Sequence, residues 1–143
     1  SQLVLAEDRL NLVVHQQLGQ QYLTSDVAQL PAQSIFLLQQ DHCLAEHTQT
    51  LCNLIDVSKI NPFLATSVQT LVQMVDAHQG VTFLPQMAIN SDILNGTDLL
   101  VRLSDAPAHR NIGVIWRSSS RCVDTYQQLA EIIKVAVKAK CQA

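Results

Sequence analysis

The sequence lacks the long apolar runs of a membrane protein and the positive charge of a nucleic-acid binder. No apolar run approaches the roughly 20 residues that span a bilayer, and no basic and then apolar signal peptide opens the chain. With 9 Lys and Arg against 12 Asp and Glu, the net charge is −3 and the pI is about 5.9. This balance argues against direct binding of nucleic acid by this segment, and we expect no membrane partner.

Internal repeats, low-complexity segments and dense cysteines are also missing. Four cysteines in 143 residues are sparse for a secreted scaffold held by disulfides, so we expect thiols and a cytoplasmic protein. A hydrophobic share of 48% with 15% charged residues indicates a globular chain, neither disordered nor fibrous. The length allows one ordinary domain or two small lobes with a buried core.

Short apolar runs alternate with amphipathic stretches along the chain. We expect strands at 1–5, 10–14, 34–38, 61–66, 81–84, 99–103 and 111–116. We expect helices near 24–30, from 41 to about 56, at 67–79 and 86–94, and after 118–120. This alternation predicts an α/β fold whose mainly parallel sheet is covered by helices on both faces.

Polar residues and glycines mark the ends of several of these elements. Ser67 is expected to cap the helix at 67–79 and Gly80 to end it. The glutamine-rich stretch 15–21 is interpreted as a loop, and Asn95-Gly96 as a turn.

The most informative stretch is 41–52, which follows the buried strand at 34–38 and reads DHCLAEHTQTLC. Asp41 is a candidate N-cap, which places His42 and Cys43 in the first helical turn, where the helix dipole favours an anion. A thiol there, beside an imidazole that can carry charge, ionises more readily than a free cysteine, and the thiolate is the reactive species. The pattern is typical of a reactive cysteine.

A second cysteine, Cys52, lies nine positions after Cys43. An unbroken helix would separate the two by about 13 Å on opposite faces, whereas a disulfide needs Cα atoms within about 7 Å. If these cysteines bond, the helix must unwind, and thiol oxidation becomes a conformational switch. Packing of Cys52 in the core of the reduced protein is the main alternative.

Zinc binding is the other chemistry that this stretch allows, because His42, Cys43, His47 and Cys52 are all zinc-ligand types. Cys43 and His47 lie at i, i+4 and can chelate from one helical face. Cys52 falls on the opposite face, however, and the paired close spacings of structural zinc motifs are missing. We therefore expect no metal and no cofactor.

The other candidate residues have ordinary structural interpretations. Cys122 and Cys141 are expected to be inert packing residues. Arg110, taken alone, is a strand-start residue in a surface ion pair. Thr66 and Ser67 form a helix cap, at a helix start that can also bind an anion. Three histidines are expected to be solvated loop residues: His15, His78 and His109.

Several segments together carry a likeness to a known family. They are Asp41-His42-Cys43-Leu44 with Cys52, Ala65-Thr66-Ser67 leading into 70–75, the run 80–85, the run 110–113, and the helical run 126–130. In this combination the chain resembles OxyR, the hydrogen-peroxide sensor among the LysR-type transcription regulators. The resemblance covers essentially the whole chain. The run 80–85 is common to LysR-type effector domains, whereas the His-Cys pair with a second cysteine at this spacing is specific to OxyR.

The resemblance implies a role for each candidate residue. Cys43 would be the peroxidatic cysteine, which forms a sulfenic acid, and Cys52 the resolving cysteine, which converts it to an intramolecular disulfide. The peroxide pocket would be lined by His42, His47, Thr66 and Arg110, with the guanidinium stabilising the thiolate. His47 stands where glutamine is usual in the family, which leaves its role open.

The resemblance also implies an architecture and partners. The fold would be that of LysR effector domains, with two Rossmann-like lobes similar to periplasmic binding proteins of type II. Its sheet would be mixed, with helices on both faces. Residues 1–15 would cross into the second lobe, 16–108 form that lobe with the redox cysteines, and 109–143 return into the first lobe with the C-terminal helix. The protein would act as a homodimer, paired into a tetramer at full length, and would contact promoter DNA and RNA polymerase.

Two parts of the family pattern are expected to be absent from this chain. One is the N-terminal DNA-binding domain, and the other is the first part of the first lobe. Because that part supplies threonine hydroxyls to the peroxide pocket, this chain alone would hold an incomplete site.

Three classes of function compete. The first is a redox sensor in which the Cys43–Cys52 disulfide refolds the segment and alters transcription. The second is a small-molecule effector domain of a LysR-type regulator in which the cysteines are incidental. The third is a thiol peroxidase that turns over, but no Cys-x-x-Cys or other catalytic motif supports it. We favour the sensor and expect no enzyme.

Overall fold

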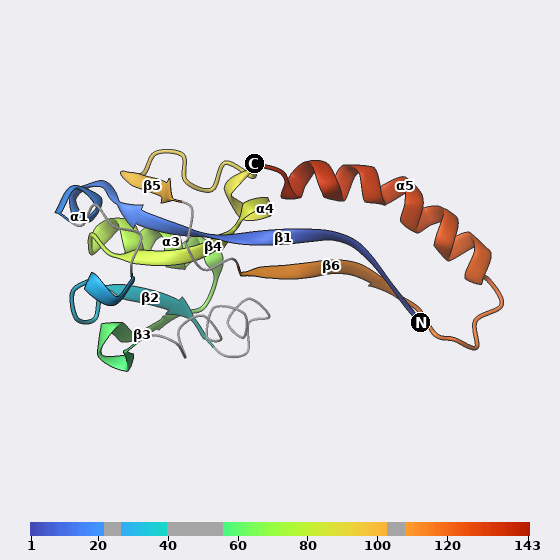
Figure 1. Ribbon diagram of the computed structural model, residues 1–143, viewed down its shortest axis with the longest axis horizontal. Helices are drawn as coiled ribbons and strands as arrows, with labels where there is room; N and C mark the ends of the chain where they lie inside the picture. The colour runs from blue at the N-terminus through green and yellow to red at the C-terminus, as the bar shows by residue number, and fades with distance from the viewer. Residues whose placement is uncertain (22–26, 40–55, 103–107) are drawn as a thin grey trace.

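The computed structural model describes residues 1–21, 27–39, 56–102 and 108–143 (Figure 1). The predicted cysteine helix, with His42, Cys43, His47 and Cys52, lies outside these residues. The strands are β1 (Gln2–His15), β2 (Ile35–Leu38), β3 (Ile60–Ala65), β4 (Val81–Pro85), β5 (Leu99–Arg102) and β6 (His109–Ile115). The α-helices are α1 (Gln16–Gln21), α3 (Val68–Ala77), α4 (Gln86–Ile89) and α5 (Val123–Cys141), and two short 3-10 helices lie at Val27–Gln29 and Val57–Lys59.

Strand β1 is one continuous strand of 14 residues, so the predicted division into strands at 1–5 and 10–14 is wrong. Three charged residues at 7–9 interrupt the apolar pattern, but the strand does not break there. The reason is a change of partner: β6 pairs with β1 as far as Arg9, and β4 takes over at Leu10. Inter-strand hydrogen bonds therefore hold the backbone extended through the polar stretch.

The strands form a mixed sheet in the order β3-β2-β4-β1-β5, with β6 paired to the N-terminal part of β1. Strand β2 runs parallel to β3 and β4, whereas β1 runs antiparallel to β4, β5 and β6. In Figure 1, β1 and β6 extend together away from the compact sheet, and α5 lies alongside them. The mixed α/β architecture is confirmed, but the expectation of a mainly parallel sheet is wrong, because β1 runs antiparallel to all three of its partners.

Helices cover both faces of this sheet. On one face, Val13 and Leu84 pack with the apolar side of α3, which contributes Leu71, Val72 and Val75. On the other face, Leu12 and Phe83, which are directly opposite each other on β1 and β4, pack with Leu18 of α1. Successive strand residues thus enter opposite cores, as the period of two requires.

Helix α1 replaces the loop that was predicted at 15–21. His15 precedes the helix, and its Nδ1 accepts a hydrogen bond from the backbone N–H of Gln17 at 3.2 Å. Leu18 is buried beneath it. One helical turn with one apolar anchor is too short for periodicity to reveal, and glutamine has a fair helix propensity.

The start of α3 agrees with the prediction, and its end differs in detail. The Ser67 hydroxyl accepts a hydrogen bond from the Thr70 backbone N–H at 3.1 Å, which confirms the cap. After the helix, however, the left-handed residue is Gln79, with φ of 52°. Gly80 is needed for close approach, because a Cβ there would lie 2.5 Å from the Phe36 ring and 2.9 Å from the Ser34 carbonyl oxygen.

Helix α4 is shorter than the predicted 86–94. It ends at Ile89, and turns continue to residue 96. Asp92 has φ of 62°, which the right-handed helix does not allow, and Gly96 has φ of 78° in the predicted Asn95-Gly96 turn. Among the described helices, none combines the length and apolar character needed to cross a bilayer.

The close approach at Gly80 generates a stability prediction. We expect Gly80→Ala to lower the free energy of unfolding by about 1–3 kcal/mol, because the new methyl group must displace the Phe36 ring and a backbone carbonyl. Gly19→Ala is the matched control: its Cβ would meet the flexible end of Arg102 at 3.1 Å. Because alanine favours a helix by about 0.5–1 kcal/mol over glycine, we expect no net destabilisation there. Urea unfolding followed by circular dichroism measures both, and equal effects would contradict this account of Gly80.

Candidate functional site

The structure describes two of the predicted pocket residues, Thr66 and Arg110. Thr66 is exposed between the end of β3 and Ser67, the cap of α3. Arg110 is the second residue of β6. The two residues come from separate elements, and within the described residues no hydrogen bond or ion pair joins them. Each is therefore considered by itself.

Arg110 is paired with Asp8, which lies directly opposite on β1. The Asp8 Oδ2 atom accepts from Nε of Arg110 at 3.0 Å and lies 2.9 Å from Nη2. The Asp8 side chain is 0% exposed, and that of Arg110 is 19% exposed. The predicted ion pair is therefore present, but the expectation that it lies at the surface is wrong, because the middle of β1 is covered by neighbouring elements.

Helix α4 supplies the second interaction of Asp8. The other carboxylate oxygen, Oδ1, accepts a hydrogen bond from the Met87 backbone N–H at 3.0 Å. Both oxygens of the buried carboxylate are thus satisfied, one by a helix start and one by a guanidinium. A buried ionised carboxylate requires this degree of compensation.

A chain of side-chain amides continues from the same helix to the C-terminal end of α5. Asn11 of β1 donates to Gln86 at 2.8 Å, and Gln86 donates to Asn90 at 2.9 Å. Asn90 in turn donates to the carbonyl oxygens of Lys140 and Gln142 at 2.9 and 2.6 Å. These bonds fix the end of α5 beside α4, as Figure 1 shows.

The two described cysteines differ in their surroundings. Cys122 is exposed at the start of α5, so its predicted role as a packing residue is wrong. Cys141 is partly covered near the end of α5. Burial raises the pKa of the Cys141 thiol, and the negative charge of Asp8 raises it further, while Arg110 acts in the opposite direction. Burial and the charge of Asp8 therefore both disfavour the reactive thiolate at this position.

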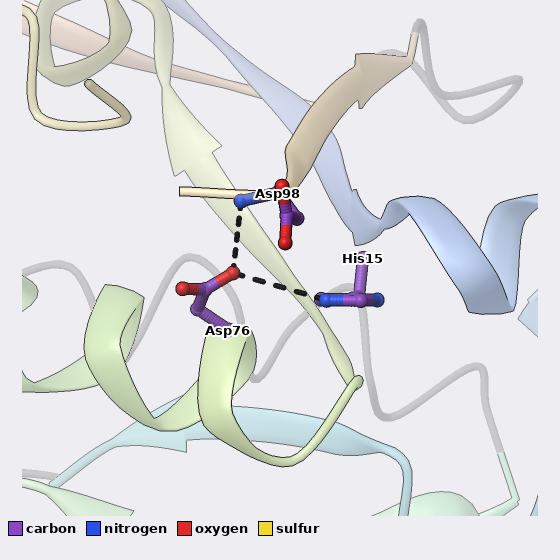
Figure 2. A group of neighbouring side chains, drawn as sticks. All are labelled: His15, Asp76 and Asp98. Atoms are coloured by element: carbon purple, nitrogen blue, oxygen red, sulfur yellow. Dashed lines mark hydrogen bonds and ion pairs between the residues drawn. The ribbon is translucent and has the colours of Figure 1, made fainter. Parts of the chain in front are cut away.

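His15 is not the solvated loop residue that the sequence suggested. It is 6% exposed and ends β1, where Asp76 of α3 and Asp98 before β5 lie beside it (Figure 2). Its Nε2 lies 3.9 Å from Asp76 Oδ1, and the same oxygen accepts from the Asp98 backbone N–H at 3.0 Å. His78 and His109 are exposed, as expected, but His109 belongs to β6 and not to a loop.

These three side chains are of metal-ligand type, and one ligand atom from each lies within 4.8 Å of the others. The hydrogen bond from Gln17 argues against a metal, however. Because Nδ1 of His15 accepts that bond, the proton of the neutral ring belongs on Nε2, and a metal would need the Nε2 lone pair. The arrangement fits a structural role in which Nε2–H faces the Asp76 carboxylate. We call the group of His15, Asp76 and Asp98 the clasp.

Sequence reasoning missed both Asp8 and the His15 cluster. The signal for Asp8 was weak, because it is one of three consecutive charged residues at 7–9 and nothing local distinguishes it from Glu7. For His15 the sequence gave no local signal, because its partners Asp76 and Asp98 are 61 and 83 positions away in the chain (76 − 15 and 98 − 15).

Comparisons with known proteins agree with the fold. The LysR substrate binding domain family matches residues 1–137. EstR, an HTH-type transcriptional regulator of Acinetobacter baylyi, is 29% identical over 131 residues, which are 91% of this chain and 44% of that protein. OxyR of Escherichia coli, a DNA-binding transcriptional dual regulator, is 30% identical over 108 residues, which are 76% of this chain and 35% of that protein.

Among the solved structures that resemble this chain is the regulatory domain of an OxyR-type regulator. The reduced form of the regulatory domain of OxyR2 from Vibrio vulnificus is 40% identical, with a TM-score of 0.85, and the match covers 94% of this chain and 64% of that one. This chain therefore has the architecture of LysR effector domains. It spans less than half the length of the two curated relatives.

The surroundings of the two described thiols predict different reactivity. We expect iodoacetamide to alkylate Cys122 several-fold faster than Cys141 at mildly alkaline pH, because the raised pKa of Cys141 leaves less thiolate. The labelling rate of Cys141 should rise steeply with pH, because the raised pKa of its thiol delays formation of the thiolate. A time course analysed by peptide mass spectrometry, with Cys141→Ser as the assignment control, measures the two rates. Faster labelling of Cys141 would contradict this interpretation.

The clasp around His15 gives a second prediction. We expect Asp76→Ala to lower the free energy of unfolding by about 1 kcal/mol, because the Asp98 N–H loses its acceptor. Asp98→Ala is the control: its carboxylate is exposed and its backbone bonds remain, so we expect little change. Thermal melts with and without added zinc test the metal alternative, in which both variants would lose the same zinc-dependent stabilisation.

Proposed function

The chain belongs to the LysR substrate-binding domain family, and from that premise we propose that it is the peroxide-sensing part of an OxyR-type transcription regulator. The observation that carries this proposal is the 40% identity to an OxyR2 regulatory domain over 94% of the chain. The sequence itself adds His42-Cys43 and, nine residues on, Cys52. The relatives are transcription regulators, and no enzyme family is indicated.

In this proposal, peroxide oxidises the chain in two balanced steps. The Cys43 thiolate attacks one oxygen of hydrogen peroxide, the O–O bond breaks, and the departing hydroxide takes up a proton to leave as water. The resulting sulfenic acid condenses with the Cys52 thiol, which forms the disulfide and releases a second water. The two thiols lose two electrons, and the peroxide gains them.

We assign supporting roles to the other pocket residues. His42 and Arg110 supply positive charge that favours the Cys43 thiolate, and His47 and Thr66 offer further polar groups. What supports Arg110 in this role is its guanidinium, always protonated and held at a fixed place by a buried carboxylate. No metal or other cofactor is required by this chemistry.

The readout belongs to the whole regulator. We propose that the disulfide refolds the segment around Cys43 and Cys52, changes the dimer and tetramer arrangement, and so alters contacts with promoter DNA and RNA polymerase in the cytoplasm. Residues 16–108 would form the lobe that carries the switch, with 1–15 and 109–143 linking it to the other lobe. The continuous β1 and its pairing with β6 support this division.

A small-molecule effector domain with incidental cysteines is the second candidate. What supports it is the match to EstR, a transcriptional regulator whose name does not mention peroxide, over 91% of the chain. In this alternative, ligand binding rather than thiol oxidation would regulate the protein.

Brief exposure to micromolar peroxide distinguishes the two candidates. We expect a Cys43–Cys52 crosslink in the peptide map, because in this proposal Cys43, which follows His42 in the sequence, forms the sulfenic acid and Cys52, nine residues on, resolves it. The crosslink should vanish in Cys43→Ser and persist in the double variant Cys122→Ser with Cys141→Ser. If Cys43 does not oxidise in either this chain or the full-length regulator, the proposed sensor function is wrong and the effector domain is favoured.

A further inference from the structure

We propose that Asp8 is a positioning residue for Arg110, which fixes the guanidinium so that its remaining N–H groups are available to an anion. The inference rests on the proposed function, in which that anion is the Cys43 thiolate. Asp8 itself does not contact peroxide in this account. It acts through Arg110 alone.

The placement of the pair is dictated by the backbone. Asp8 and Arg110 are directly opposite partners in the antiparallel ladder of β1 and β6, so their side chains emerge next to each other. Around this point, α4 approaches β1, β6 begins, and the C-terminal end of α5 arrives (Figure 1). The carboxylate is therefore enclosed by several elements rather than held by one flexible segment.

The carboxylate has no freedom to move away from Arg110. Its Oδ1 is held by the Met87 N–H at 3.0 Å, and its Oδ2 by Nε and Nη2 of Arg110 at 3.0 and 2.9 Å. The side chain is fully buried. Loss of either partner would leave a buried charge under-compensated, which is far more costly than losing a surface pair.

The contacts use only one edge of the guanidinium. Nε and Nη2 face Asp8, and within the described part of the chain Nη1 has no hydrogen-bond partner. The planar fork of arginine carries five N–H donors, so one edge can be anchored while another binds an anion. The Arg110 side chain as a whole is 19% exposed. Cys141 of α5 is the described thiol on which the charges of both Asp8 and Arg110 act.

A competing account makes Asp8 an attenuator, whose negative charge merely weakens the field of Arg110. The two accounts predict opposite signs. If Asp8 attenuates, its neutralisation makes Cys43 more reactive. If Asp8 positions, its neutralisation frees the arginine rotamers, and the new amide N–H groups of an asparagine would point at Nε–H, so Cys43 becomes less reactive.

Asp8→Asn is the direct test, since it keeps the volume and an oxygen for the Met87 N–H. We expect the rate of Cys43 oxidation by peroxide to fall by at least about fivefold, and the pH midpoint of Cys43 alkylation to move upward. Glu7→Gln is the matched control. Glu7 is the neighbouring carboxylate on β1, is 71% exposed and faces His109 at 3.9 Å, so its removal should leave both quantities unchanged.

A double-mutant cycle separates positioning through Arg110 from a general structural role. In an Arg110→Gln background, we expect Asp8→Asn to cause no further loss of Cys43 reactivity. If Asp8→Asn fails to fold by circular dichroism, Arg110→Lys decides, because lysine keeps the charge but has no fork for Asp8 to hold. Wild-type reactivity in Arg110→Lys would then overturn the proposal.

The outcomes distinguish this inference from the function on which it rests. An inert Cys43 in the wild-type chain and the full-length regulator removes the proposed function, and with it the role of Asp8. A reactive wild type with an equally fast or faster folded Asp8→Asn variant overturns the positioning role alone. Additive losses in the double-mutant cycle also overturn it.

Discussion

The complete burial of the Asp8 carboxylate constrains how β1, β6 and α4 are placed relative to one another. An ionised group that is removed from water needs hydrogen bonds and opposite charge, and here these come from two elements far away in sequence. Arg110 brings β6 to β1, and the Met87 amide brings the start of α4 to the same place. Three elements are thus tied at a single side chain, and the end of α5 follows through Asn90.

Strand β1 connects two regions of different character. Its residues from Leu10 onward are buried between β4 and β5, whereas its earlier residues pair with β6 alone and have α5 beside them. Because this strand changes partners without a break, the hydrogen bonds to β6 and those to β4 hold one continuous backbone. The position of β6 is thereby fixed relative to β4. Asp8 lies just before this change of partner. Its interactions therefore link the compact sheet to the extended pair of strands.

The sequence predicted the elements whose physics is local. Strands β2 and β4 are buried apolar runs, and Ser67 caps α3 through a bond three residues along the chain. It did not predict features that depend on distant partners. The polar stretch at 7–9 suggested a break in β1 because β6, which holds it extended, begins a hundred residues later. His15 suggested a loop for the same reason, since Asp76 and Asp98 are distant in the chain.

In the candidate site, too, the sequence indicates the type of a residue, whereas its environment depends on distant parts of the chain. Taken alone, Arg110 was expected to form a surface ion pair. Only the structure shows that its partner is buried and which edge of the guanidinium that partner occupies. Cysteine alone was even less informative: Cys122 is exposed, and Cys141 lies where burial and Asp8 raise its thiol pKa. The same Asp8 that disfavours a thiolate at Cys141 anchors the arginine proposed to favour one at Cys43. Because arginine stays protonated throughout the physiological range, an arginine anchored in this way supplies a constant field. Any pH dependence of sensing would then arise from the thiol and from the neighbouring imidazole of His42.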